Sequence, residues 1–299
     1  MAWRLKKIFP IEGLTLFYVV ATALYMLVWP GAVDKQIMLS LLGIRLLVVT
    51  AILLFNLMPL TKFMALIRQV MPAALILHWY PETYHINSCL FANLDSFFMK
   101  IDGLLFCCQP SLEFSSAIPW VWFSELMNFT YISFYVIINV TVFYLYYKEA
   151  AKGAHAAFML LFAFMSYYVL FILIPVIGPQ YHITTPEEAL PYSWPFRAFL
   201  RILQEMGEKP TGAFPSSHVG VTIICLIILY VRKERKLCSY FLPLSVLLIA
   251  STVYIKAHYL IDVVAGLLTA PLFYWLGLCV WKKVGGQGLI TQSRIVEDG

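Results

Sequence analysis

The feature that most constrains this chain is a series of long apolar runs. A membrane-spanning helix needs ~20 mainly apolar residues. The runs expected to span a bilayer are residues 13–29, 37–58, 63–80, 119–147, 154–178, 214–231, 238–257 and 258–281. Only 12% of the residues are charged, whereas soluble domains carry about 25%. Most of the chain is therefore expected to lie in lipid.

The pattern inside these runs distinguishes helices from a barrel. In hydrocarbon every backbone polar group must be paired within the protein, which leaves helical bundles or closed barrels. Barrel strands alternate apolar and polar residues over ~10 residues, but these runs are unbroken. We predict an all-α fold, a polytopic membrane helical bundle of about eight spans in a single domain, 1–299. The third run is the weakest, because it contains Arg68 and Pro72.

The basic residues indicate how the bundle is oriented. With the N-terminus in the cytoplasm, the cytoplasmic segments hold thirteen of them, namely Arg4, Lys6, Lys7, Lys62, Lys148, Lys152, Arg232, Lys233, Arg235, Lys236, Lys282, Lys283 and Arg294. The outer segments then hold five, which are Lys35, Lys100, Arg197, Arg201 and Lys209. Cytoplasmic loops collect Lys and Arg, so both termini are predicted to be cytoplasmic.

This orientation places two polar segments, 81–118 and 179–213, on the extracytoplasmic side, either periplasmic or lumenal. Within the second, the helical spacing of 196–206 predicts a helix that lies along the membrane interface. The net charge of +5 is explained by topology, so no nucleic-acid partner is expected.

A first polar cluster, Gly212-Ala-Phe-Pro-Ser-Ser-His218, stands where an apolar helix is expected to begin. Serine suits a helix cap, and proline suits the first turn. The free N–H groups and the positive dipole end at such a helix start bind anions, phosphate in particular. His218 would stand on the first turn beside the bound anion. An ordinary capped helix with an interfacial histidine would show the same pattern.

A second cluster runs from Ser251 to Asp262. His258 and Asp262 are four residues apart and therefore share one helix face. The aspartate can then hold an imidazole N–H and raise the basicity of the other ring nitrogen. Lys256 lies in the same outer turn and is a candidate partner for an anion. Ionisable residues at the edge of a bilayer core are usually functional, although a self-satisfied buried His–Asp pair has the same spacing.

Both clusters fall at the outer ends of their helices, so they are predicted to face one shared space. Pro-Ser-Ser-His218, followed about 40 residues later by Ser251-x6-His258-x3-Asp262, resembles two signatures of the type-2 phosphatidic acid phosphatase superfamily, P-S-G-H and S-R-x5-H-x3-D. The resemblance covers roughly residues 119–281 and implies a six-helix catalytic core there.

The resemblance also implies a role for each matched residue. His258 would be the nucleophile that takes the phosphoryl group, and Asp262 would orient it. His218 would be the general acid that protonates the leaving oxygen. Ser216 and the backbone of Ser217 would hold phosphate oxygens.

The chain departs from the family pattern at two basic positions. The arginine beside Ser251 is replaced by Thr252, and Lys256, one turn away, could supply that charge. The first signature, K-x6-R-P, is missing. At its expected place the chain reads Ile174-Pro-Val-Ile-Gly-Pro-Gln-Tyr-His182, where Gln180 and Tyr181 are predicted to contact the substrate. Other candidates for the missing charge are Arg197, Arg201 and Lys209.

Lacking both basic positions is a feature of the phosphosphingolipid synthase branch of this superfamily. The motifs Gly212-Ala-Phe-Pro-Ser-x-His218 and His258-Tyr-x-x-Asp262-x-x-x-Gly266 are similar to those of inositol phosphorylceramide synthases. Such enzymes transfer a phosphoalcohol head group between lipids. The resemblance thus implies a lipid phosphotransferase that works through a phosphohistidine and needs no metal or other cofactor, with membrane lipids as its partners.

Several alternatives stay open. A lipid phosphatase would use the same residues with water as the acceptor. A metal-dependent hydrolase could use His182, His218, His258 and Asp262 as ligands. An intramembrane serine protease would need its serine and histidine at mid-bilayer depth, whereas these lie at helix ends. A transporter would need repeats or broken helices around a midplane site, and the sequence shows neither.

Five other charged residues call for simpler interpretations. Arg45 stands in the middle of a predicted span and is expected to snorkel or to pair within the bundle. Asp95, Asp102, Glu113 and Glu125 fall on the outer side. A solvated loop face is favoured for these four over a site for a lipid head group.

Overall fold

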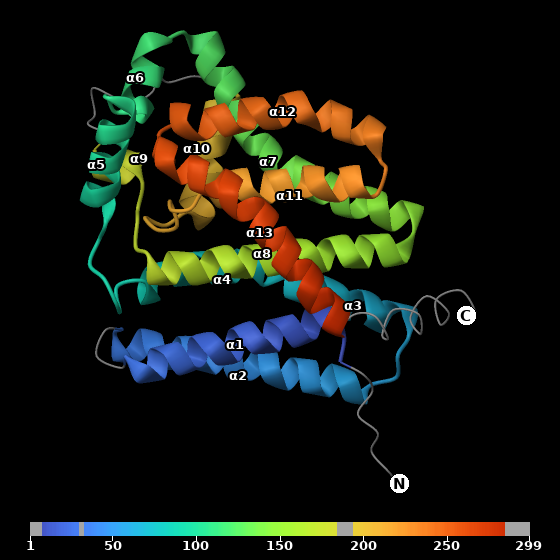
Figure 1. The fold of residues 1–299 in the computed structure, drawn as a ribbon. Helices are drawn as coiled ribbons and strands as arrows, with labels where there is room; N and C mark the ends of the chain where they lie inside the picture. Colours follow the sequence, from blue (N-terminus) through green and yellow to red (C-terminus); the bar gives the residue numbers. More distant parts are fainter. Residues whose placement is uncertain (1–7, 30–32, 184–193, 285–299) are drawn as a thin grey trace.

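The computed structural model describes residues 8–29, 33–183 and 194–284, and these residues form helices without strands (Figure 1). The helices are α1 (Pro10–Val28), α2 (Lys35–Leu57), α3 (Lys62–Ala74), α4 (Ile76–Ile86), α5 (Asp95–Phe106), α6 (Pro110–Ala117), α7 (Val121–Lys148), α8 (Ala150–Leu173), α9 (Pro179–His182), α10 (Phe196–Gly207), α11 (Ser217–Val231), α12 (Arg235–Tyr254) and α13 (Leu260–Val284).

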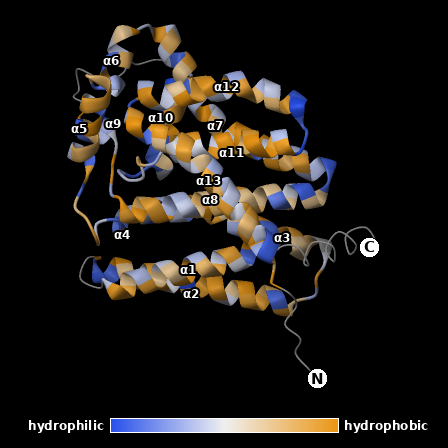
Figure 2. Cartoon of the chain, in the orientation of Figure 1, coloured by the Kyte–Doolittle hydropathy of each residue, from blue (hydrophilic) through white to orange (hydrophobic). Residues whose placement is uncertain are grey.

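Seven segments of the described chain are long and apolar enough to cross a membrane. They are α1, α2, the pair α3–α4 over Phe63–Ile86, α7, α8, α12 and α13. The eighth apolar helix, α11, has 15 residues. These helices correspond to the eight runs of the sequence and confirm the prediction of an all-α polytopic membrane bundle. Figure 2 shows apolar residues along the helices and hydrophilic residues at the turns between them.

The centre of the bundle is built by α7, α8, α11, α12 and α13, which pack against one another. The antiparallel pair α1–α2 packs at the edge of the bundle, on the face of α8 that points away from α12 (Figure 1). The short helices α5, α6 and α9 gather at one end of the bundle, where α11 and α13 begin. The two polar clusters of the sequence therefore lie at the same end.

Charged residues inside the N-terminal spans are paired. Arg68 of α3 donates through Nε to the Glu12 carboxylate of α1 at 2.6 Å, and both side chains are buried. Arg45 of α2 pairs with the buried carboxylate of Glu82 in α4, which confirms pairing rather than snorkelling. Because each charge meets its counter-ion, the weak third run still forms its two helices within the bundle.

Candidate functional site

The two histidines of the sequence motifs face each other. His218 lies on the first turn of α11, and His258 lies in the turn between α12 and α13, with ring centroids 5.9 Å apart. The backbone joins the two motifs directly, because the Ser216 N–H donates to the Asp262 carbonyl at 3.0 Å. The two motifs therefore lie side by side, as expected from their positions at helix ends.

The orientation of the His258 ring is set mainly by a backbone carbonyl. Its Nδ1 lies 2.7 Å from the Ala213 oxygen and 3.6 Å from Asp262 Oδ2. A carbonyl can only accept, so Nδ1 carries the proton and Nε2 presents its lone pair. From the sequence, Asp262 was expected to accept this hydrogen bond. The structure differs because the chain before α11 brings the Ala213 carbonyl closer.

Asp262 is completely buried and uses Oδ2 to accept the Tyr259 N–H at 2.8 Å. Its Oδ1 has no hydrogen-bond partner among the described residues. A carboxylate 3.6 Å from Nδ1 favours a positive charge on the imidazole ring. Asp262 is thus placed to stabilise the cationic ring that forms when Nε2 takes an electrophile.

Burial sets the charge of His258. Removal from water lowers the pKa of its imidazole to about 4, although the Ala213 hydrogen bond and the negative charge of Glu208 act in the opposite direction. Since the pKa lies well below 7, the ring is neutral at neutral pH. Nε2 can therefore act as a nucleophile without first losing a proton.

Aromatic packing fixes the His218 ring. It stacks on Tyr131 with centroids 4.5 Å apart and meets the Phe134 ring at 4.3 Å. Both aromatic residues come from α7. The contacts hold the imidazole on the side of α11 that faces His258, within reach of a group bound between the two rings.

The start of α11 has the features of a phosphate site. The Ser216 side chain caps the helix by accepting the Val219 N–H at 3.4 Å, and the Ser216 carbonyl accepts the Gly220 N–H. The other N–H groups of this first turn belong to Ser217 and His218. Such N–H groups and the helix dipole bind phosphate oxygens. The Ser216 hydroxyl therefore caps the helix, and the Ser217 backbone N–H is the group placed to bind a phosphate oxygen.

A glycine lets the two motif helices meet. A Cβ on Gly266 of α13 would lie 2.6 Å from the Ser216 carbonyl oxygen, which is backbone and cannot turn away. Any side chain at this position would push the start of α11 away from α13. The glycine of the His258-Tyr-x-x-Asp262-x-x-x-Gly266 motif is thus explained by close packing.

The segment at the place of the missing basic signature also reaches the site. Gly178 has φ +93°, and a Cβ there would lie 2.6 Å from the Ala257 carbonyl oxygen. Two residues later, the Gln180 N–H donates to the Lys256 carbonyl at 2.8 Å. Gln180 therefore lies beside the His258 turn, and its contact with a substrate stays a prediction. Tyr181 follows it on α9 and is half-exposed.

Glu208 is a residue of this site that the sequence did not reveal. Its Oε1 accepts from the Gln180 side chain at 2.7 Å, and its negative charge acts on His258. Burial raises the pKa of the Glu208 carboxyl. Glu208 stands in the polar segment 179–213, outside any motif or helical pattern, so nothing in the sequence marked it. Lys256 is buried in the adjacent turn, and its role toward an anion stays a prediction.

The solvated loop face expected for the outer acidic residues is wrong for Asp95 and Asp102. Both are completely buried. Asp95 accepts the N–H groups of Ile177 and Gly178 at 2.8 and 2.9 Å. Asp102 accepts those of Leu260 and Ile261, also at 2.8 and 2.9 Å, and so caps α13. These carboxylates hold the backbone around the site, because buried N–H groups in a loop or at a helix start need partners outside the helix.

The other two acidic residues differ from each other. Glu113 is exposed, as expected. Glu125 of α7 accepts the N–H groups of Phe196 and Arg197 at 2.7 and 3.1 Å and so caps α10. The predicted helix over 196–206 is therefore present and joined to α7. The remaining candidate cations, Arg201 and Lys209, have exposed side chains.

The four ligands of the metal-dependent alternative are not gathered in one place. His182 Nε2 lies 3.5 Å from Ser96 Oγ at the end of α9. Within residues 8–29, 33–183 and 194–284, no three His, Cys, Asp or Glu side chains are grouped as metal ligands. The arrangement that the structure does form is a neutral imidazole facing a second imidazole at a helix start.

Comparison with known proteins points to the part of the chain that holds this site. The family described as the PAP2 superfamily matches residues 98–276, which hold both motifs. No curated protein and no solved structure matches the chain.

Proposed function

The chain belongs to the PAP2 superfamily, and from this premise we propose that it transfers a phosphorylated head group from one membrane lipid to another through a phosphohistidine. The proposal depends on the orientation and charge of the His258 ring. Its Nδ1 faces the Ala213 carbonyl, and Nε2 is left neutral beside His218 and the start of α11. Lipid phosphatase or phosphotransferase chemistry follows from the family, and the transfer step is the finer proposal.

The proposed reaction has two steps. His258 Nε2 attacks phosphorus, a nitrogen–phosphorus bond forms, and the bond to the leaving oxygen breaks while His218 protonates that oxygen. An acceptor hydroxyl then gives its proton to His218 and attacks phosphorus, which releases His258. The N–H groups of Ser217 and His218 stabilise the equatorial oxygens in both steps. Asp262 stabilises the charged ring of the intermediate.

Charge around the site favours a phosphodiester substrate over a phosphomonoester. The two basic positions of the family are absent, and the Glu208 carboxyl acts on His258. A monoester carries up to two negative charges at neutral pH, since its second pKa is about 6, whereas a diester carries one. A donor such as a phosphoinositol lipid, with ceramide or diacylglycerol as acceptor, fits this balance.

A transfer assay tests the proposal. Purified protein in vesicles is given a phosphodiester lipid and a lipid alcohol, and product lipid and free head group are measured together. We expect transfer to exceed hydrolysis, and turnover of a monoester lipid to be at least about tenfold slower, equivalent to about 1.4 kcal/mol. Glu208→Gln keeps the side-chain shape but removes the negative charge. It should therefore reduce the difference in turnover between the phosphodiester lipid and the monoester lipid.

Fast release of inorganic phosphate from the monoester, with no transfer to any added alcohol, would replace this proposal with the phosphatase alternative. Metal analysis of the same preparation tests the metal-free mechanism. A stoichiometric bound metal that is needed for activity would overturn it.

We also propose that the site faces the extracytoplasmic side. The opposite end of the bundle carries Lys148, which pairs with Glu234 at 3.4 Å, and the basic α11–α12 turn. Cytoplasmic loops collect such residues. Four of the basic residues that support this orientation, Arg4, Lys6, Lys7 and Arg294, lie outside the described part of the chain.

Labelling from one side of sealed vesicles tests this orientation. The exposed native thiols of Cys107 and Cys108 are first replaced by serine. Cysteines placed at the exposed positions Arg201, near the site, and Glu149, at the opposite end, should then react with an impermeant thiol reagent from opposite sides. Arg201→Cys should react from outside. Reaction of both from the same side would contradict the topology.

A further inference from the structure

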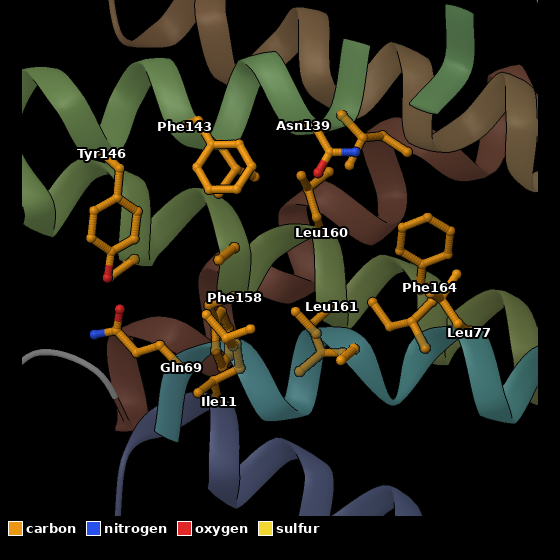
Figure 3. Close-up of a pocket in the computed structure, with 18 of the residues that line it drawn as sticks. Ile11, Gln69, Leu77, Asn139, Phe143, Tyr146, Phe158, Leu160, Leu161 and Phe164 are labelled. Atoms are coloured by element: carbon orange, nitrogen blue, oxygen red, sulfur yellow. The ribbon is translucent and has the colours of Figure 1, made fainter. Parts of the chain in front are cut away.

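A cavity of about 620 Å³ lies beside the site and is partly open at the surface of the bundle, where Leu77 and Phe143 of its lining are exposed (Figure 3). Its walls come from α7 and α8 on one side and from α3, α4 and the start of α1 on the other. At one end the lining includes Ser217 and His218, so the cavity is continuous with the site. Towards the other end, Tyr146 and Gln69 face each other across it.

The cavity is deeper than one leaflet of a membrane. On α8 its lining runs from Ala154 to Tyr168, and on α7 from Phe134 to Tyr146. At ~1.5 Å per residue these stretches are roughly 21 and 18 Å long. Half of a hydrocarbon core of ~30 Å is only about 15 Å. A chain that filled the cavity from the site would therefore extend beyond the bilayer midplane.

The lining chemistry fits a hydrocarbon chain. No described residue of the wall is charged, and most are aliphatic or aromatic. The polar groups are largely engaged within the protein. Asn139 Nδ2 donates to the Tyr135 carbonyl at 2.8 Å, and the Tyr168 hydroxyl donates to the Ile76 carbonyl at 3.2 Å. The volume lies within the range of about 300–1,000 Å³ that is usual for ligand sites.

One wall of the cavity lies outside the part of the chain that matches the family. The match begins at residue 98, whereas α1, α3 and α4 all precede it. The buried Glu12–Arg68 pair joins α1 to α3. The N-terminal spans thus supply part of the wall of this cavity.

We infer that this cavity holds one hydrocarbon chain of the lipid whose phosphate ester reacts at His258, and that its depth selects chains longer than one leaflet. The inference rests on the proposed function for the identity of the reacting ester. It assigns to the N-terminal spans a role in choosing the substrate. Because Ser217 and His218 line the same cavity, a lipid whose chain lies there has its head group beside His218 and His258.

Obstructing the cavity tests the inference through chain length. Ala157 of α8 lines the cavity about 16 Å below Tyr168, at ~1.5 Å per residue. Ala157→Phe should raise KM at least about tenfold for a lipid whose chain reaches beyond that depth. A short-chain lipid with the same head group should react at the unchanged rate, which also shows that the variant folds. Ala154→Phe, one turn deeper, is a second obstructing variant.

The matched control is Val169→Phe, which adds a ring to an exposed position of the same helix outside the cavity lining. This variant should leave both substrates unaffected. The inference would be overturned if Ala157→Phe changed the KM of the long-chain and short-chain lipids by the same factor. It would also be overturned if Val169→Phe raised the KM of the long-chain lipid as much as Ala157→Phe does.

A binding measurement separates this inference from the proposed function. A lipid phosphate ester with a photoreactive group at the end of a long chain is added to His258→Ala protein, which cannot turn it over. Crosslinks are expected around Tyr146 and Gln69 and should be lost in Ala157→Phe. Crosslinks confined to the outer surface would overturn the cavity assignment alone. Cavity crosslinks in a protein whose unaltered form turns over no phosphate ester would overturn the proposed function alone.

Discussion

His258→Gln is expected to abolish turnover and the covalent phosphoenzyme together. Glutamine has no ring nitrogen that can bond to phosphorus, so the first step has no nucleophile. The loss should be on the order of 10⁴-fold or more, as for other catalytic nucleophiles. Transfer of a radiolabelled head group to protein, quenched in alkali because phosphohistidine is acid-labile, measures the intermediate directly.

His155→Gln is the matched control for this substitution. His155 is also buried, but it lies at the far end of α8, where its ring meets Trp281 with centroids 4.9 Å apart. Its replacement should leave the phosphoenzyme intact. A phosphoenzyme that persists in His258→Gln would show that another residue is the nucleophile, and His218 would be the first to examine.

The spans were predictable because apolar length is enough to specify a membrane helix. The closeness of the two histidines was also predictable, since both motifs were read at helix ends on the same side. The predicted His258–Asp262 pair on one helix face was not found, because His258 lies in the turn before α13 and its ring bonds to the Ala213 carbonyl. The third span was harder to predict. Arg68 weakens its hydropathy, and only the fold brings Glu12 from a distant part of the sequence to neutralise it.

Three features of the site had no readable signal. The group closest to His258 Nδ1 is the Ala213 carbonyl, and a backbone atom is the same in every residue type. Asp95 and Asp102 look like loop residues until the backbone N–H groups that they pair are placed beside them. Glu208 depends on how an irregular segment folds back onto Gln180. Each is a tertiary contact, which local spacing does not determine.

The cavity was unpredictable for a different reason. It is the space that α1, α3, α4, α7 and α8 leave between them, so it depends on how helices from separate parts of the chain pack. Its lining residues have the same composition as the lipid-facing surface. Hydropathy alone therefore cannot distinguish a wall that binds one chain from a surface that meets bulk lipid.

His218→Ala is expected to slow phosphoenzyme formation by an amount that depends on the leaving group. A lipid alkoxide is a strong base and needs a proton as its bond to phosphorus breaks. General acid catalysis contributes about 10²–10⁴-fold in such cases, so the loss should fall in this range. A nitrophenyl ester with the same phosphoryl group departs without a proton, and its loss should stay below about tenfold.

The comparison isolates the acid role because both esters use the same nucleophile and the same phosphate site. Removing the His218 ring also opens space beside Tyr131 and Phe134, which contact it at 4.5 and 4.3 Å between centroids. Any general disturbance of the site from that space lowers both rates by the same factor and cancels in their ratio. Equal losses for the lipid and the nitrophenyl ester would therefore show that His218 shapes the site without donating the proton.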